Sequence, residues 1–192
     1  LQTLPERALP SGWAEVIKHA LILDPALLAE MERNASRLRA LDRELTPQII
    51  ARSSAIKGRL VEEDEKETLG RRTILNYGHT IGHALEAVTG YQRLLHGEAV
   101  AIGMMGAAMI GNAVGVTPAP LVARQRRLLS SYGLPVSYKG LDPEAVQQAM
   151  GLDKKVSGGT IQWVLLEESG KTVVRKGVPQ DVVQSVLAKL FS

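Results

Sequence analysis

The 192-residue chain has the length and composition of one soluble globular domain. Hydrophobic residues make up 45% of it and charged residues 22%, and the net charge is +3, values that are ordinary for a domain with its own core. So small and scattered a charge argues against a nucleic-acid partner, although it would suit a small anionic substrate. Because cysteine is absent, disulfides and thiolate ligands are excluded, and any metal must be bound by histidine and carboxylate groups.

The sequence carries no sign of secretion or of membrane insertion. The first ten residues lack the charged start and the apolar run of a signal peptide. The uncharged stretch at 99–122 contains Asn112 and two prolines, whereas a membrane span needs about 20 strongly apolar residues. We therefore expect a buried helix there, no contact with a membrane and a cytoplasmic location. The chain begins without Met, which we interpret as a domain cut from a longer protein.

Helical patterns cover most of the chain. Residues 10–12, Pro-Ser-Gly, predict a turn before the first helix, and the pairs at 24–25 (Asp-Pro) and 46–47 (Thr-Pro) are typical of helix starts. The acidic run at 62–68 is expected to be a loop or a helix end, either solvated or functional. Apolar spacing predicts helices at about 13–23, 25–40, 47–61, 72–89, 97–114, 120–132, 143–150 and 180–191.

One β-hairpin interrupts this helical pattern. Residues 160–166, TIQWVLL, are rich in β-branched and aromatic residues, and residues 168–171 (Glu-Ser-Gly-Lys) supply a turn before residues 172–176 return. The fold class expected from these patterns is mainly α, a multihelical domain with one small β-hairpin.

Three of the four histidines lie close together in the sequence. His79 and His83 are four residues apart and share one helix face, and His96 opens the next helix. Imidazoles that converge from two helices are what a divalent metal such as zinc needs; the alternative is that each is a hydrogen-bonded core residue. Gly78 and Gly82 destabilise a helix, so they need a reason, either room for a ligand or close helix packing.

Charged residues suggest further candidates. Glu15 and Lys18 share a helix face, and their spacing fits either a compensated buried pair or an exposed salt bridge; we interpret the neighbouring His19 as structural. Arg72, Asn76 and the first two histidines fall at intervals of four, three and four, so a single helix would present them as one polar stripe. Candidate contacts for an anion are Lys57, Arg72, Asn76, Lys154 and Lys155.

Several segments resemble 3-dehydroquinate synthase, a member of the sugar-phosphate cyclase group. They are GWAEVIKHALI, RRTILNYGHTIGHALE after DEKET, LLHGEAVAIGM, and DKK at 153–155. The resemblance implies that residues 1–192 form the family's C-terminal helical domain, which binds metal and substrate. The N-terminal NAD-binding domain is expected to be absent, because no Gly-rich turn follows a strand here.

The resemblance also implies a reaction. The family is a carbon–oxygen lyase of the shikimate pathway of aromatic amino acid biosynthesis, converting 3-deoxy-D-arabino-heptulosonate 7-phosphate to 3-dehydroquinate and phosphate. Its cofactors are Zn²⁺ or Co²⁺ and an NAD that transiently oxidises one substrate hydroxyl. The implied partners are this phosphorylated sugar acid, the NAD-binding domain and a second copy in a homodimer. The isolated domain is expected to be inactive or nearly so.

Position by position, the resemblance makes Glu15, His79 and His96 the metal ligands. It thereby replaces the pairing of His79 with His83 that spacing alone suggests, and gives His83 a role in proton transfer or hydrogen bonding beside the substrate. Lys18 and Lys57 are the other implied catalytic residues. The implied substrate contacts are Lys18, Lys57, Arg72, Asn76, His83 and Lys155.

Two of these assignments have close competitors. The chain carries one residue more than the common family spacing between Asp64 and Asn76, so Arg71 competes with Arg72. The R-x-x-L-N spacing favours Arg72. Lys154 likewise competes with Lys155 for the substrate phosphate. Alternative functions are another sugar-phosphate cyclase, a metal-dependent polyol dehydrogenase, and a non-catalytic helical module that binds a partner.

Overall fold

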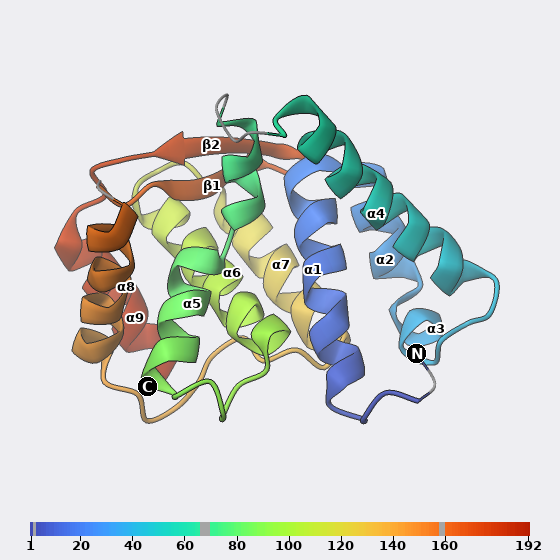
Figure 1. The fold of residues 1–192 in the computed structure, drawn as a ribbon, viewed down its shortest axis with the longest axis horizontal. Helices are drawn as coiled ribbons and strands as arrows, with labels where there is room; N and C mark the ends of the chain where they lie inside the picture. The colour runs from blue at the N-terminus through green and yellow to red at the C-terminus, as the bar shows by residue number, and fades with distance from the viewer. Residues whose placement is uncertain (2, 66–69, 158–159) are drawn as a thin grey trace.

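The computed structural model describes residues 1, 3–65, 70–157 and 160–192, without the side chains of 152–157. Its main elements are helices, with one antiparallel hairpin (Figure 1), so the predicted fold class is confirmed. The helices are α1 (Ala8–Leu23), α2 (Pro25–Arg33), α3 (Ala35–Arg39), α4 (Leu45–Glu63), the 3-10 helix η1 (Arg71–Asn76), α5 (His79–Val88), α6 (His96–Ala113), α7 (Ala119–Ser131), α8 (Pro143–Ser157) and α9 (Gln180–Phe191). The strands are β1 (Trp163–Glu168) and β2 (Lys171–Arg175).

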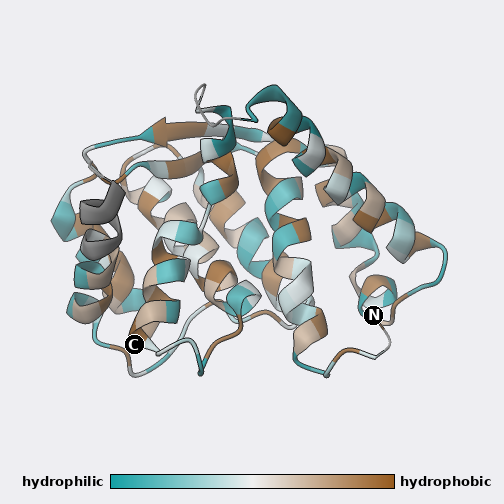
Figure 2. Ribbon diagram, in the orientation of Figure 1, coloured by the Kyte–Doolittle hydropathy of each residue, from teal (hydrophilic) through white to brown (hydrophobic). Residues whose placement is uncertain are grey.

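Helix α6 lies at the centre of the molecule. It packs against α1, α5, α7, α9 and β1, and it is buried along almost all of its length because its side chains are small and uncharged. Helix α4, at the edge, mixes hydrophilic and hydrophobic positions (Figure 2), as a half-solvated helix does. The buried helix expected within 99–122 is thus confirmed, and no described helix is long and apolar enough to cross a membrane.

Glycines allow α5 to approach α6 unusually closely. A Cβ on Gly103 would lie 2.0 Å from the carbonyl oxygen of Gly78, and one on Gly82 would lie 3.3 Å from the Cα of Val100. Only hydrogen fits at the first of these contacts. A Cβ on Gly78 itself would lie 2.7 Å from the backbone nitrogen of Met104 in α6, so close helix packing is a reason for both Gly78 and Gly82.

The first predicted turn is wrong. Residues 10–12 lie inside α1, which already begins at Ala8. Pro10 falls in the first turn of the helix, where its missing N–H would have had no helical partner. The proline therefore does not end the helix, and a Cβ added at Gly12 would meet no atom of another part of the protein within 4 Å.

Three other helix boundaries differ from those predicted. The helix expected to reach about residue 40 breaks at Asn34, whose side-chain amide donates to the carbonyl of Glu30 at 3.0 Å. Helix α4 begins at Leu45, because the carboxylate of Asp42 accepts from the Leu45 N–H at 2.9 Å. Helix α8 runs seven residues beyond the predicted end at 150, to Ser157.

The predicted helix at 72–89 is wrong as one continuous element. It consists of η1 and α5, separated by Tyr77 and Gly78. Gly78 has a φ of +81°, a left-handed conformation that glycine adopts at little cost. Tyr77 is fully buried, and its hydroxyl donates to Gln125 Oε1 at 2.7 Å. The tyrosine anchor and the glycine turn therefore redirect the chain, and Arg72 and Asn76 do not share a helix face with the histidines.

The hairpin lies along one edge of the helices (Figure 1). Trp163 pairs with Arg175 and Val164 with Val174 in the antiparallel register. Strand β1 is buried against α6, and the N–H of Gly170 in the turn donates to the carbonyl of Leu21 in α1 at 2.8 Å. The hairpin thereby closes the end of the helical core where α1 ends.

Candidate metal and substrate site

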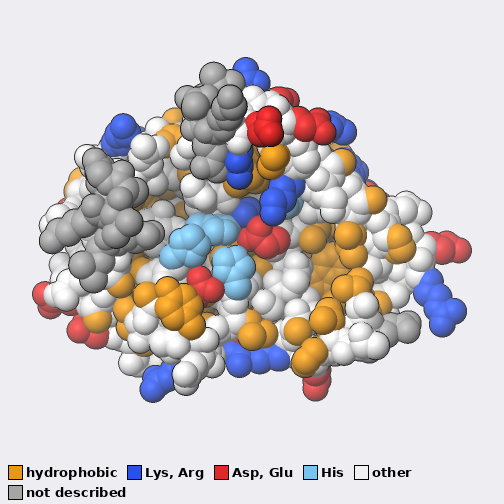
Figure 3. Space-filling view, in the orientation of Figure 1, with side chains coloured by type: hydrophobic (Ala, Val, Ile, Leu, Met, Phe, Trp, Pro, Cys, Tyr) orange, Lys and Arg blue, Asp and Glu red, His pale blue; other side chains and the backbone are white. Residues whose placement is uncertain are grey.

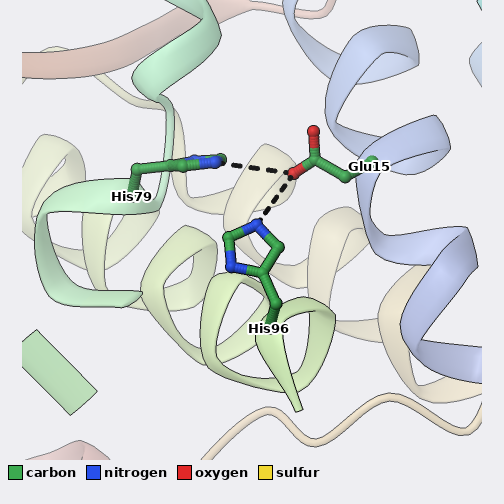
Figure 4. Close-up of side chains that lie close together, drawn as sticks. All are labelled: Glu15, His79 and His96. Carbon is green, nitrogen blue, oxygen red and sulfur yellow. Dashed lines mark ion pairs between the residues drawn. The ribbon is translucent and has the colours of Figure 1, made fainter. Parts of the chain in front are cut away.

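Helices α1, α5 and α6 bring three predicted ligands together. The Oε1 atom of Glu15 lies 3.6 Å from Nε2 of His79 and 4.0 Å from Nε2 of His96. Figure 4 shows both imidazoles pointing at this one carboxylate oxygen. Among the described residues, these three form a group whose ligand atoms all lie within 4.8 Å of one another.

The start of α6 is docked directly on α1. The N–H of Gly97 donates to the hydroxyl of Ser11 at 3.0 Å, and a Cβ on Gly97 would lie 1.9 Å from the Ser11 carbonyl oxygen. Glu98 accepts from the backbone N–H of Leu95 at 2.8 Å and so caps the helix. His96 is the first residue of α6, and this contact therefore fixes its Cα relative to Glu15.

Glu15 has one paired and one unpaired oxygen. Its Oε2 accepts from the ammonium of Lys18 at 2.8 Å. Its Oε1 is buried and has no hydrogen-bond partner. A buried acceptor without a partner destabilises the folded state by about 1–3 kcal/mol, and this one lies beside two imidazole nitrogens. A divalent cation fits this donor set, because it would satisfy the carboxylate oxygen and both nitrogens.

The ion pair of Glu15 and Lys18 is half-buried. The Lys18 side chain is 3% exposed and that of Glu15 is 33% exposed, so the pair is neither fully enclosed nor a surface bridge. Burial raises the pKa of Glu15, but the charge of Lys18 and its hydrogen bond outweigh this, and the net pKa is lowered. Burial also lowers the pKa of Lys18, with Glu15 opposing. The carboxylate is thus held in its metal-binding, charged form.

His79 is held in the neutral form that binds metals. Burial, assisted by the charge of Lys18, lowers the pKa of His79 to about 4. Its Nδ1 lies 3.2 Å from the carbonyl oxygen of Tyr77. A carbonyl only accepts hydrogen bonds, so Nδ1 carries the proton and the Nε2 lone pair faces Glu15.

His83 lies beside this group but outside it. Its ring centroid is 5.3 Å from that of His79 and 6.3 Å from that of His96, and its side chain is exposed on α5. The ring-centroid distances do not separate the three histidines, since His79 and His96 are 5.5 Å apart. The ligand atoms do, because the described group within 4.8 Å contains Glu15, His79 and His96 and not His83. His19 is buried, and its Nδ1 lies 2.8 Å from the hydroxyl of Ser53 in α4, in keeping with a structural role.

Two of the predicted substrate cations, Lys57 and Arg72, lie on α4 and η1. Arg72 and Asn76 line a hollow of about 190 Å³ together with Asp64, Gly70, Thr73 and Leu75. Arg71 instead donates to Glu63 at 2.8 Å on the exposed surface, so only Arg72 of the two faces the hollow. Lys57 is exposed on α4, and its charge helps to lower the pKa of Lys18. The side chains of Lys154 and Lys155 lie outside the described residues.

One face of the molecule carries these groups. Figure 3 shows the histidines gathered near its middle, beside acidic and basic side chains.

Sequence reasoning missed two residues that build the site. Glu86 Oε1 lies 3.0 Å from Nδ1 of His96, and the hydroxyl of Ser11 holds the start of α6. The sequence could have indicated Glu86, because positions 79, 83 and 86 are spaced by four and three residues and therefore share one helix face. Ser11 had none, since its role depends on a contact 86 residues away.

Comparison with known proteins decides the family. The family model described as 3-dehydroquinate synthase C-terminal matches residues 12–156. The chain belongs to this family. It is 40% identical over 192 residues to the 3-dehydroquinate synthase of Methylacidiphilum infernorum, covering 100% of this chain and 52% of that protein. With the enzyme of Nostoc punctiforme it shares 45% identity over 190 residues, covering 97% of this chain and 52% of that one.

Solved structures agree with the fold. The 2-epi-5-epi-valiolone synthase ValA of Streptomyces hygroscopicus, with NAD⁺ and Zn²⁺ bound, superposes with a TM-score of 0.87 at 24% identity, covering 98% of this chain and 52% of that one. A 2-deoxy-scyllo-inosose synthase complexed with carbaglucose-6-phosphate, NAD⁺ and Co²⁺ gives a TM-score of 0.80 at 26% identity, covering 100% and 54%. The chain thus spans about half the length of the proteins that it matches.

Proposed function

We propose that this chain is the metal- and substrate-binding part of a 3-dehydroquinate synthase. The observation that carries the proposal is the convergence of Glu15, His79 and His96 around one unpartnered carboxylate oxygen. The curated relatives at 40–46% identity bear the name of this enzyme and are about twice as long as the chain. The activity is therefore proposed for an enzyme that adds an NAD-binding domain to residues 1–192.

Zn²⁺ or Co²⁺ would be bound by the two Nε2 atoms and by Oε1 of Glu15. Two imidazoles and one carboxylate leave coordination positions open for substrate, as in catalytic zinc sites, and the ValA structure holds Zn²⁺. When bound, the metal would act as a Lewis acid on a substrate oxygen, and NAD would supply the transient redox chemistry.

The chain's own residues would bind and orient an anionic sugar. The proposed substrate is 3-deoxy-D-arabino-heptulosonate 7-phosphate, and the proposed reaction is a carbon–oxygen lyase step that yields 3-dehydroquinate and phosphate. Lys18 is fixed beside the metal ligands by Glu15, so it would meet substrate oxygens there. Arg72 and Asn76 line the neighbouring hollow and would bind negatively charged and hydroxyl groups.

His83 and the lysines complete this assignment. Because His83 is exposed and adjacent to His79, it would exchange a proton with a bound substrate. Lys57 would approach the substrate from α4, and Lys155 would bind its phosphate. A homodimer and a cytoplasmic location remain predictions from the family.

A metal-binding experiment tests the site. We expect His79→Ala and His96→Ala to abolish zinc binding by the purified chain, measured by metal content after dialysis, whereas His83→Ala should retain it. Circular dichroism would confirm that each variant is folded. Unchanged zinc content in both ligand variants, or its loss in His83→Ala, would show that the ligand set is wrong.

An activity experiment tests the reaction. Joined to an NAD-binding domain of a 3-dehydroquinate synthase, the chain should release phosphate from 3-deoxy-D-arabino-heptulosonate 7-phosphate and form 3-dehydroquinate. Alone, it should show little or no turnover. Turnover of a different sugar phosphate, with none of this one, would instead favour another cyclase, the class to which the structural neighbours belong.

A further inference from the structure

His96 is contacted by a carboxylate on each side of its ring. Its Nδ1 lies 3.0 Å from Oε1 of Glu86, and its Nε2 lies 4.0 Å from Oε1 of Glu15. The imidazole itself is half exposed, at 49%, whereas Glu86 is only 14% exposed. Glu86 comes from α5 and His96 from α6, so this contact joins the two helices at the edge of the site.

We propose that Glu86 is a positioning residue that keeps the proton of His96 on Nδ1 and directs its Nε2 lone pair toward Glu15 and His79. The inference rests on the proposed metal site, to which it adds a residue outside the ligand set. A carboxylate only accepts hydrogen bonds, so Nδ1 is the donor in this contact, and in the neutral imidazole the lone pair is then on Nε2. That tautomer is the one that binds a metal through Nε2, and an anionic acceptor also makes the imidazole a stronger ligand.

The two histidines differ in how they are oriented. His79 is 14% exposed and its Nδ1 faces a backbone carbonyl, that of Tyr77. The orientation of the His79 ring is therefore set by the backbone and does not depend on another side chain. His96 is half exposed and its Nδ1 faces a side chain instead of the backbone, so without Glu86 we expect its ring to rotate and to take either tautomer. Loss of Glu86 should consequently affect His96 alone, which makes His79 an internal reference.

The placement of Glu86 on α5 supports this role. It follows His83 by three residues and His79 by seven, so the three side chains share one helix face. The same face of α5 thus carries one proposed ligand, one proposed substrate-facing histidine and the carboxylate that orients the second ligand. All three face the start of α6, where His96 lies.

The test compares Glu86→Leu, which removes the acceptor, with Glu86→Gln, which keeps an amide oxygen as acceptor without the charge. In the metal-free, ¹⁵N-labelled chain, long-range ¹H–¹⁵N spectra report the tautomer of each imidazole. We expect His96 to be protonated on Nδ1 in the wild type, to become a mixture of tautomers in Glu86→Leu and to be largely restored in Glu86→Gln. The His79 signals should not change.

Zinc affinity supplies the second readout. Competition with a chromophoric chelator should show binding about 10–100-fold weaker in Glu86→Leu, with a smaller loss in Glu86→Gln. Glu167→Gln is the matched control, because it removes the same charge from the pair with Lys171 in the hairpin. It should leave both readouts unchanged.

An unchanged His96 tautomer in Glu86→Leu would overturn the inference, as would an equal change at His79. If Glu86→Leu does not fold, the test rests on Glu86→Gln. The positioning role is overturned if the His96 tautomer or the zinc affinity of Glu86→Gln differs from the wild type by no more than that of Glu167→Gln does. If the wild-type chain binds no zinc, the proposed function fails, while the tautomer spectra still decide the role of Glu86.

Discussion

The two halves of the candidate site are held in place differently. The metal-ligand side, where α6 meets α1 and α5, is held by helix packing, whereas the substrate-cation side, formed by η1 and the end of α4, is held by polar contacts. On the first side, Gly97 and Gly103 bring α6 against the backbone of its neighbours so closely that no side chain fits between. On the second, η1 depends on the carboxylate of Asp64, which accepts from the N–H groups of Arg71 and Arg72 at 2.9 and 3.4 Å. Close packing fixes the relative positions of the helices tightly, whereas a short 3-10 turn has poorer hydrogen-bond geometry and depends on the few side chains that hold it.

The largest effect is expected from Gly103→Ala. The added Cβ would lie 2.0 Å from the Gly78 carbonyl oxygen, a backbone atom that cannot move without separating α5 from α6. We expect the free energy of unfolding to fall by more than about 3 kcal/mol, and zinc binding to fall with it. Urea denaturation and metal content would measure both.

Gly58→Ala is the matched control for this change. Gly58 lies inside α4, and a Cβ added there would meet no atom of another part of the protein within 4 Å, so alanine should stabilise the protein by about 0.5–1 kcal/mol. A Gly103→Ala protein as stable as the wild type would show that the close approach of α5 and α6 is not required.

A pH-dependent effect is expected from His19, which connects the two sides. Its ring joins α1 to Ser53 of α4, and burial, with the charges of Lys18 and Lys57 against that of Glu15, lowers its pKa to about 4. In the unfolded chain the imidazole is protonated as the pH falls below about 6.5, whereas in the folded chain it stays neutral until the pH approaches 4. The contribution of neutral His19 to the free energy of unfolding is therefore fully present above pH 6.5 and is lost as the pH falls toward 4. For a shift of this size the loss is roughly 3 kcal/mol.

The variant His19→Gln should therefore show a smaller loss of stability between pH 7 and pH 4 than the wild type. Denaturation of the metal-free chain at several pH values would measure the two slopes, and the value at pH 8 would account for any change that is independent of protonation. Equal slopes would mean that His19 is protonated in the folded state as readily as in the unfolded one.

A smaller effect is expected from Asp64→Asn, which tests the polar side. The buried carboxylate holds the first two amides of η1, and an amide oxygen accepts less strongly. We expect a loss of about 1–3 kcal/mol, with faster hydrogen exchange at the amides of Arg71 and Arg72 and no change in α5 and α6.

Asp142→Asn is the control for the polar side, because it alters an exposed carboxylate that accepts from the Glu144 N–H at 3.0 Å. It should change the free energy of unfolding much less. Faster exchange throughout α5 and α6 in Asp64→Asn would show that the two sides are not independent.

The smallest effect is expected from Arg71→Ala. Arg71 and Glu63 form a pair in which both side chains are more than half exposed, and such pairs contribute little. The free energy of unfolding should change by less than about 0.5 kcal/mol. In the enzyme completed with an NAD-binding domain, Arg72→Ala should raise the KM for the sugar phosphate, and Arg71→Ala should not. The reverse result would assign the substrate arginine to position 71.

Much of the fold could be predicted because its signals are local. The Asp24-Pro25 start was correct: the Asp24 carboxylate accepts from the Leu27 N–H at 2.9 Å. The closing helix at 180–191 was also correct in both bounds. The break at Tyr77-Gly78 was not predicted, because helical spacing continues through it and a glycine alone does not show whether it turns the chain. The burial of Tyr77 and its hydrogen bond to Gln125 depend on a distant segment.

The sequence by itself determined the family, because long motifs in the right order match it, and through that resemblance it indicated the candidate ligands Glu15, His79 and His96. Only the tertiary structure decided how those residues meet. Glu15 and His96 are 81 positions apart, and they converge because glycine contacts place the start of α6 on α1. The same folding placed Glu86 behind His96 and paired Arg71 away from the hollow, since contacts between distant segments depend on packing that local patterns do not encode.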